Sequence, residues 1–184
     1  MMSLADVQSM GAELGLVQVY TGEGKGKTTA ALGLALRAWG HGLRVCIIQF
    51  MKVGEDYGEV IALRKIEGID IYQFGSDHLV FEGEQTDEDI ALAERGLNLA
   101  TEVLESNEYD VLILDEINVA LYFGLLSVKN VLTMIKNRSG GMEVVLTGRH
   151  APKEVLGIAD LVTVMRAEKH PYDSGVVARK GIEF

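Results

Sequence analysis

The chain has 184 residues, of which 48% are hydrophobic, and this is enough to bury the core of one globular domain. Its formal net charge of −10 repels the backbone of a nucleic acid, so DNA and RNA are not expected as partners. No apolar stretch reaches the roughly 20 residues of a membrane-spanning helix, so no membrane association is expected.

Residues 1–15 are predicted to form an extension that is helical or flexible. They contain Asp6 and Glu13, and they lack the early cationic patch and the long apolar centre of a secretory signal. We therefore expect the protein to stay in the cytoplasm. A single folded domain is predicted over residues 16–184.

A glycine-rich segment follows the first strand-like run and precedes a helix-like run. Residues 21–29 read TGEGKGKTT, and the order of strand, glycine-rich turn and helix start is that of a P-loop, which cradles the phosphates of a nucleotide. All residues of this segment are predicted to contact the nucleotide: Thr21, Gly22, Glu23, Gly24, Lys25, Gly26, Lys27, Thr28 and Thr29.

The individual roles within this loop follow from residue type. Its three glycines are expected to let backbone N–H groups turn inward, while Lys27 places a cation between phosphate oxygens. The hydroxyl of Thr28 is expected to face Mg²⁺. One residue departs from the pattern, because the P-loop motif has glycine at the position of Thr21.

Six apolar runs rich in β-branched residues are predicted to be strands, and most of the segments between them have helical spacing. These runs cover residues 16–20, 45–50, 69–74, 111–114, 144–147 and 161–165. Their pattern predicts a three-layer α/β domain of the P-loop NTPase type, with a mostly parallel sheet covered by helices on both faces. Cys46 lies in the second run and is expected to be a small buried residue rather than a reactive one.

Two helices and two irregular segments complete the predicted order. Thr86 and Asp89 form the pattern of a capping box, and it is followed by an apolar helical face of Ile90, Ala93, Leu97, Ala100 and Leu104. A second face consists of Val128, Val131, Leu132 and Ile135. The segments 52–58 and 74–85 are irregular, and they either line a ligand site at the carboxyl ends of the strands or are ordinary surface connections.

Two adjacent carboxylates follow the fourth strand-like run. Asp115 and Glu116 come directly after four apolar residues, as the acidic residues of a magnesium–nucleotide site do. Together with Thr28 they are the predicted metal ligands. Alone, this pattern also fits a strand that simply ends in an acidic turn.

Six blocks of the sequence resemble those of the P-loop family of ATP:corrinoid adenosyltransferases. They cover residues 22–31, 37–42, 49–52, 114–121, 147–149 and 169–184, and they occur in the order of the family. The similarity extends from about Val17 to the last residue. The blocks DEINVAL and KHPYDSG…KGIEF are more specific than the P-loop, which indicates a nucleotide but no particular reaction.

The resemblance implies transfer of the 5′-deoxyadenosyl group of ATP to the Co(I) centre of a reduced corrinoid, with release of triphosphate. Because Co(I) is itself a strong nucleophile, the reaction needs stabilisation of the leaving triphosphate and an in-line placement of the ribose C5′. Family members are held to bind ATP reversed along the loop. The resemblance further implies Mg²⁺ or Mn²⁺, a flavin-dependent reductase that supplies electrons, and a homodimer.

Matching to the family blocks assigns further roles to individual residues. Lys27 and Arg149 would act catalytically on the triphosphate, Asn118 would line the nucleotide site, and Arg37 would approach the nucleoside. For two of these an ordinary role stays open, since Arg37 fits a solvated helix position and Asn118 fits a turn cap.

One segment departs from the family pattern. Family members carry an aromatic-rich segment that is thought to engage the corrinoid and to help remove its lower axial ligand. At that place this chain has residues 75–83, GSDHLVFEG, without a tryptophan. Phe81, with Val80 and Leu79, is predicted to serve in its stead.

Two other functions remain compatible with the sequence. A P-loop kinase or NTPase would cleave the β–γ bond of ATP, although the chain has no arginine-rich lid segment that such enzymes use. A nucleotide-binding regulatory module without catalysis is the other alternative, because the segment 75–83 is altered.

Overall fold

A computed structural model describes residues 14–78, 80–81, 83–138 and 140–183 of the chain. Six parallel strands form one sheet in the order β3-β2-β4-β5-β1-β6. Their bounds are β1 Val17–Thr21, β2 Val45–Phe50, β3 Ile69–Phe74, β4 Val111–Asp115, β5 Glu143–Thr147 and β6 Leu161–Val164. All six predicted strands are therefore confirmed, with ends that shift by one residue at most. Most of the predicted extension, residues 1–13, lies outside the described residues.

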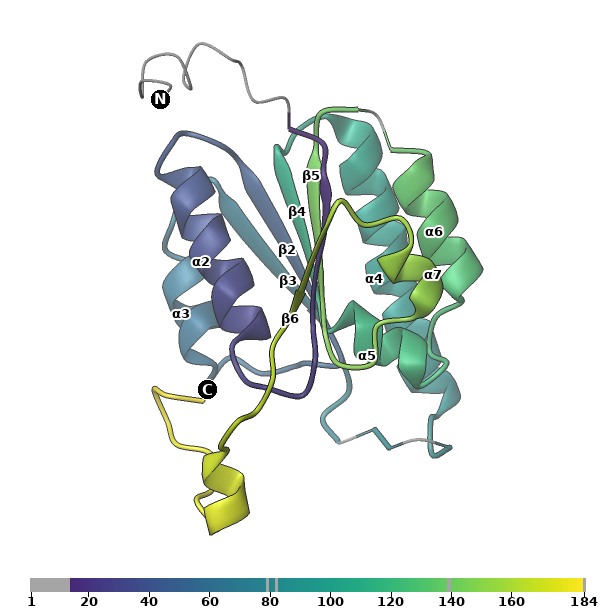
Figure 1. Cartoon of the computed structure of the whole chain (residues 1–184). Coiled ribbons are helices and arrows are strands. Elements are labelled where there is room, and N and C mark those ends of the chain that lie inside the picture. The colour runs from purple at the N-terminus through teal and green to yellow at the C-terminus, as the bar shows by residue number, and fades with distance from the viewer. Residues whose placement is uncertain (1–13, 79, 82, 139, 184) are drawn as a thin grey trace, which may run out of the picture.

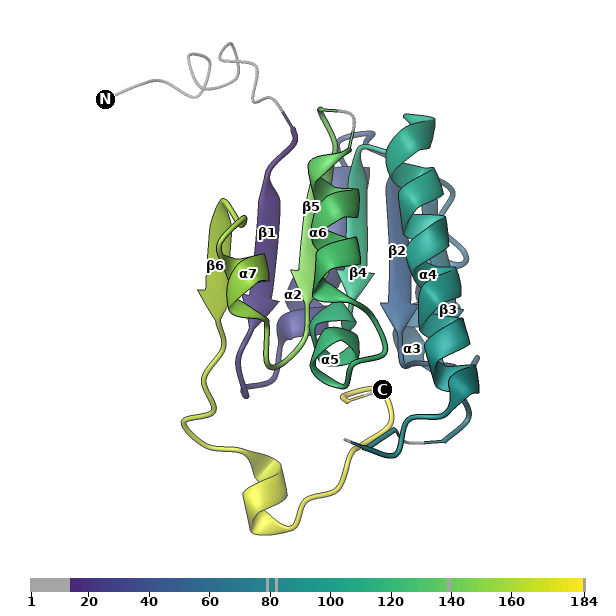
Figure 2. The same cartoon turned by 90° about the vertical axis from the view of Figure 1, so that its right-hand side faces the viewer.

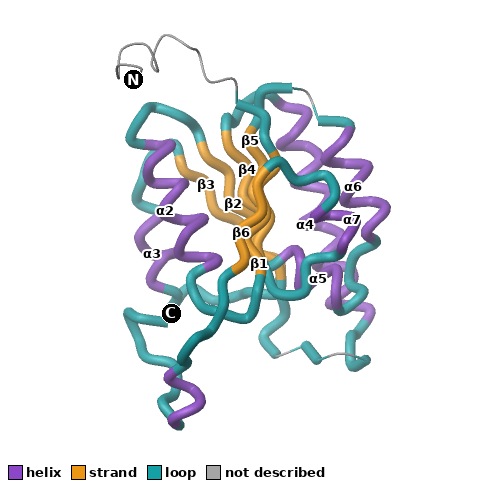
Figure 3. Tube along the Cα trace, viewed as in Figure 1, coloured by secondary structure: helices purple, strands orange, loops and turns teal. Residues whose placement is uncertain are grey.

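Helices cover both faces of the sheet, as the sequence predicts (Figures 1 and 3). One face is covered by α2 Lys27–Trp39 and α3 Gly58–Leu63. The other face is covered by α4 Asp87–Ser106, α5 Ile117–Tyr122, α6 Val128–Lys136 and α7 Lys153–Leu156. A short 3₁₀ helix, η1 Pro171–Ser174, lies in the C-terminal tail.

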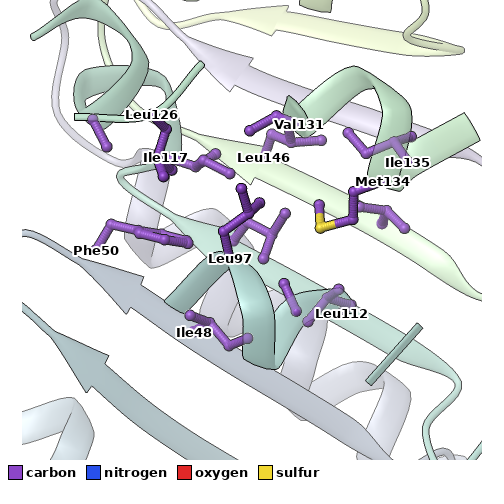
Figure 4. Close-up of a cluster of buried hydrophobic side chains, with 14 of the residues drawn as sticks. Ile48, Phe50, Leu97, Leu112, Ile117, Leu126, Val131, Met134, Ile135 and Leu146 are labelled. Atoms are coloured by element: carbon purple, nitrogen blue, oxygen red, sulfur yellow. The ribbon is translucent and has the colours of Figure 1, made fainter. Parts of the chain in front are cut away.

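Each face of the sheet has its own hydrophobic core. Side chains of α4, α5 and α6 pack on the strands on one side, with Phe50, Leu97 and Leu146 among the buried residues (Figure 4). On the other side, Ala31 and Ala35 of α2 lie against the sheet. Complete burial of a large aliphatic or aromatic side chain contributes about 1.5–3 kcal/mol, so these two layers hold the strand ends at fixed positions.

The start of α4 has the predicted capping box. The hydroxyl of Thr86 accepts a hydrogen bond from the backbone N–H of Asp89 at 3.2 Å, and the Asp89 carboxylate accepts from the backbone N–H of Thr86 at 2.9 Å. Most of the apolar face that follows is buried against the sheet, and Ile90 is partly buried there. Both the capping box and the face are thus confirmed.

The last strand corrects one expectation. Apolar character on both faces predicts burial of all six strands, yet all four residues of β6 are exposed. Leu161 and Val162 each keep 43% of their surface, and Val164 keeps 56%. The reason is that β6 is an edge strand that pairs only with β1.

The carboxyl ends of the strands meet at one edge of the sheet (Figure 2). The glycine-rich turn follows β1 there, and the segments after β2, β3, β4 and β5 emerge at the same edge, as does the C-terminal tail. Open parallel sheets bind their ligands at this edge. Among the described residues, no helix combines the length and the apolar character that crossing a membrane requires.

Candidate nucleotide-binding site

The glycine-rich turn begins one residue later than the motif suggests. Gly22 has a φ of 98° and Gly26 a φ of 111°, and only glycine adopts such angles without strain. Thr21 is still the last residue of β1, and its hydroxyl accepts a hydrogen bond from the backbone N–H of Ala151 at 3.4 Å. The turn therefore needs no glycine at position 21, which explains how threonine stands there.

Gly24 has a different role from the one predicted for it. Its backbone N–H donates to the carbonyl oxygen of Met165 at 2.8 Å, so it does not turn toward a phosphate position. A Cβ atom at Gly24 would lie 2.7 Å from the carbonyl carbon and oxygen of Arg166. The expectation of an inward N–H at this position is thus wrong, because the glycine makes room for the chain that leaves β6.

Lys27 lies folded against the loop that precedes it. Its ammonium donates hydrogen bonds to the carbonyl oxygens of Gly22 at 2.7 Å and Gly24 at 2.8 Å, and the residue is buried. Burial lowers the pKa of Lys27, and the nearby Glu116 carboxylate acts in the opposite direction. The ammonium therefore rests on the loop backbone through two hydrogen bonds.

Asp115 joins the second predicted motif to the loop. One of its carboxylate oxygens accepts hydrogen bonds from the hydroxyls of Thr28 at 2.8 Å and Thr147 at 2.7 Å. The other accepts from the side-chain amide of Gln49 at 3.1 Å and from the ammonium of Lys52 at 2.8 Å. A carboxylate has about four acceptor positions, so these donors occupy them all.

The electrostatics of this carboxylate follow from its surroundings. Complete burial by itself would raise the pKa of Asp115, but the charge and the hydrogen bond of Lys52 hold it below its usual value. Burial likewise opposes the charge of Lys52, while Asp115 raises the pKa of that ammonium above its ordinary value. The two groups are consequently a charged pair at neutral pH.

Glu116 is placed by an unusual backbone conformation. Its φ is 62°, in the left-handed region, and its backbone N–H donates to the hydroxyl of Thr147 at 2.9 Å. Burial and the charge of Asp115 raise the pKa of the Glu116 carboxyl, whereas Lys52, Lys27 and Arg149 counteract them. Non-glycine residues in this conformation cluster at functional sites. The metal role of Glu116 stays a prediction.

The residues present fit a metal ion that arrives with a nucleotide better than a bare ion. Within the described part of the chain, no group of three or more His, Cys, Asp or Glu side chains gathers in a way that could hold a metal. Thr28 and Glu116 offer oxygen atoms of the kind that Mg²⁺ prefers, and phosphate oxygens and waters commonly complete its octahedron. Direct ligation by Asp115 would require one of its four donors to leave.

Arg149 lies at the rim of the site, after β5. Its guanidinium is 3.4 Å from the carboxylate of Glu23 in the loop, and 53% of its side chain is exposed. His150 is 3.8 Å from the same carboxylate and stacks on Tyr122 with a ring separation of 4.2 Å. Lys25, on the outer side of the loop, pairs with Glu183 of the tail.

Four predicted site residues make no hydrogen bond to Asp115 or Lys27 among the described contacts: Thr29, Arg37, Phe81 and Asn118. Arg37 is exposed in the last turn of α2; it lies nine residues after Thr28, or about 13 Å along the helix axis. Thr29 is exposed on the first turn, and Phe81 is 56% exposed in the segment after β3. Asn118 is completely buried, and its amide nitrogen is 3.5 Å from the carbonyl oxygen of Gly148.

Three residues of the site were not predicted as contributors: Gln49, Lys52 and Thr147. Each hydrogen bonds to Asp115. A signal existed for Gln49, because it is a polar residue inside an otherwise apolar strand. Gln73 on β3 extends this network, since its amide donates to Gln49 at 3.1 Å.

Strand, glycine-rich loop and helix, with an acidic strand end beside them, define an α/β domain of the P-loop class. Comparison with known proteins narrows this class. A model of the family described as ATP:corrinoid adenosyltransferase BtuR/CobO/CobP matches residues 13–184. The chain belongs to this family.

Individual relatives agree with the family match. A corrinoid adenosyltransferase of Sinorhizobium sp is 38% identical over 175 residues, which is 94% of this chain and 81% of the relative. A corrinoid adenosyltransferase of Pseudomonas aeruginosa is 36% identical over 172 residues, covering 94% and 85% of the two chains. The corrinoid adenosyltransferase CobA of Salmonella typhimurium is 34% identical, covering 94% and 87%.

Proposed function

We propose that this protein transfers the 5′-deoxyadenosyl group of ATP to the Co(I) centre of a reduced corrinoid. The cobalt–carbon bond forms as the bond between C5′ and its oxygen breaks, and triphosphate leaves with the electron pair. The observation that carries the proposal is the 2.8 Å hydrogen bond between Thr28 and Asp115, which joins the two nucleotide motifs in a chain of this family.

Residues of the glycine-rich loop stabilise the leaving group. Negative charge builds on the triphosphate as the bond to C5′ breaks, and fixed cations stabilise that charge most strongly where water is excluded. Lys27 is buried beside the loop, and the guanidinium of Arg149 lies 3.4 Å from the carboxylate of Glu23 in the loop. Both can turn from their present partners to phosphate oxygens.

A Mg²⁺ or Mn²⁺ ion is part of the proposed site. Thr28 and Glu116 would hold it, with Asp115 beside them, and it would supply positive charge to the polyphosphate. ATP is proposed to lie reversed along the loop, because the reaction needs C5′ rather than the terminal phosphate at the open end of the site.

The segment after β3 is the proposed corrinoid side. Phe81 is exposed there, so its ring can contact a bound corrinoid; Leu79 lies outside the described residues. The segment is tied down by Asp89 of α4, whose carboxylate accepts from Ser76 at 2.7 Å and lies 3.4 Å from His78. These contacts attach the first part of the segment, at Ser76 and His78, to α4.

Further parts of the proposal concern the protein's surroundings. Its exposed apolar strand β6 supports a homodimer, since sheet edges are natural surfaces for pairing with a second chain. A flavin-dependent reductase would supply the electron that makes Co(I). The buried free thiol of Cys46 agrees with a cytoplasmic location.

The test is a transfer assay under anaerobic conditions. Protein, Mg-ATP and chemically reduced cobalamin are mixed, and the loss of Co(I) absorbance is followed together with the phosphate product. We expect an adenosylated corrinoid and triphosphate in equal amounts. Formation of ADP would indicate a kinase or NTPase instead, and bound but unchanged ATP would indicate a regulatory module.

A further inference from the structure

Lys52 is a charged residue of the site to which the proposed mechanism gives no task. It lies two residues after the end of β2, and its ammonium lies 2.8 Å from the Asp115 carboxylate and 3.5 Å from the hydroxyl of Thr28. It therefore stands at the junction of the two nucleotide motifs. It is also the only lysine that an ion pair joins to a buried carboxylate within the described part of the chain.

The backbone around Lys52 is held in a demanding conformation. Met51, immediately before it, has a φ of 55°, which costs a non-glycine residue free energy. On the other side, Gly75 packs so closely that a Cβ atom there would lie 2.3 Å from the backbone nitrogen of Lys52. Two separate features thus fix the direction in which this side chain leaves the sheet.

The Lys52 side chain is partly exposed, unlike its partner carboxylate. Of the Lys52 side chain 20% is exposed, compared with 1% of the Asp115 side chain. A lysine ammonium has three N–H donors, and Asp115 takes one of them. The contact to Thr28 is at the limit of a hydrogen bond, so donors remain for an acceptor that enters the site.

Asp115 is built to orient this ammonium. Its remaining acceptor positions are taken by Thr28, Thr147 and Gln49, which leaves the carboxylate no freedom to turn. A carboxylate with every acceptor position filled is a poor direct ligand for a metal ion, but it is a rigid anchor for a neighbouring cation.

We infer that Lys52 is a second phosphate-binding cation of the nucleotide site, and that Asp115 acts mainly as the residue that positions it. This inference rests on the proposed function, because it assigns the entering acceptor to the polyphosphate of ATP. The polyphosphate is then contacted by two cations: Lys27, which begins α2 after the loop that follows β1, and Lys52, which lies in the segment after β2. Thr28 and Glu116 remain as the side chains for the metal ion.

The test is the binding of inorganic triphosphate, measured by calorimetry in the presence of EDTA so that no metal contributes. Loss of one hydrogen bond to a charged group is expected to weaken binding on the order of 10- to 100-fold in Lys52→Met. Lys52→Arg should retain most of the affinity. Lys65→Met is the matched control, since Lys65 is exposed, and its affinity should equal that of the original protein.

A second variant separates phosphate binding from a purely structural effect. Lys52→Met leaves Asp115 buried without its cation, whereas the double variant Lys52→Met/Asp115→Asn removes both charges together. We expect triphosphate binding to stay weak in the double variant. The inference would be overturned if Lys52→Met bound triphosphate as tightly as the unsubstituted protein. Recovery of that affinity in the double variant would overturn it as well. Absence of adenosyl transfer in the original protein, with lysine-dependent triphosphate binding intact, would overturn only the proposed function.

Discussion

Replacing Asp115 with alanine is expected to destabilise the protein strongly. The change removes the only carboxylate that faces the Lys52 ammonium at hydrogen-bond distance within the described residues, and it takes the acceptor from Thr28, Thr147 and Gln49. Breaking a buried ion pair by removing one partner costs about 3–5 kcal/mol. Because 20% of the Lys52 side chain is exposed and its ammonium can find water, we expect the lower part of this range.

Urea unfolding at pH 7, followed by far-ultraviolet circular dichroism, measures the free energy of unfolding. The matched control is Asp56→Ala, because Asp56 is exposed, and its effect should stay within about 0.5 kcal/mol. Asp115→Asn keeps the volume but loses the charge, so it should lie between the two. A loss below about 1 kcal/mol in Asp115→Ala would refute the reasoning, because the network around this carboxylate would then contribute little.

Three further outcomes are expected. Lys27→Ala should lower the transfer rate on the order of 100-fold with Co(I) in excess, through lost stabilisation of the leaving triphosphate, and near-normal turnover would contradict the mechanism. Burial by itself would raise the pKa of Asp89, but hydrogen bonds from Ser76 and Thr86 outweigh it and hold this pKa at about 2. The contribution of the Asp89 carboxylate to stability is therefore present above the usual carboxyl pKa and is lost as the pH falls toward 2. Asp89→Asn should lower the melting temperature at pH 7, and the difference from the unsubstituted protein should shrink in acid. Burial raises the pKa of the Cys46 thiol to about 12, so a thiol reagent should label the native protein far more slowly than the urea-unfolded one.

The strands and helices could be predicted because local sequence carries their signals. Apolar β-branched runs marked all six strands, and Thr86 with Asp89 marked the start of α4. Exposure of β6 could not be predicted in the same way. Its residues are as apolar as those of the buried strands, and only the strand order places them at the edge.

The candidate site was predictable as a pair of motifs but not in its inner contacts. Asp115 and Glu116 are neighbours of the same chemical type, yet their environments differ. The Asp115 carboxylate accepts from four donors, which come from two strands, a helix and the segment after β2. Glu116 has a left-handed backbone instead, and burial and the charge of Asp115 raise the pKa of its carboxyl. Such differences depend on which strands are neighbours in the sheet, and a local sequence pattern does not predict the strand order.

Lys52 illustrates the same limit from the other direction. Its sequence neighbourhood is an irregular segment with no charge pattern. The sequence marked Lys52 only as part of a segment that could line a ligand site and as part of a block of family resemblance. Its importance arises from the packing of Gly75 and the conformation of Met51, both of which are properties of the folded backbone.

Contact between the glycine-rich loop and the chain that leaves β6 joins two regions more than a hundred residues apart. The Gly24 N–H bonds to Met165, and the lack of a side chain at Gly22 and Gly24 lets Met165 and Arg166 form the back wall of the loop. Laboratory evolution aimed at nucleotide preference should therefore sample positions 165 and 166 together with the loop. A bulky insertion just after β6 would disturb the packing of residues 165 and 166 against the glycine-rich loop, so we expect tags to be tolerated better at other positions.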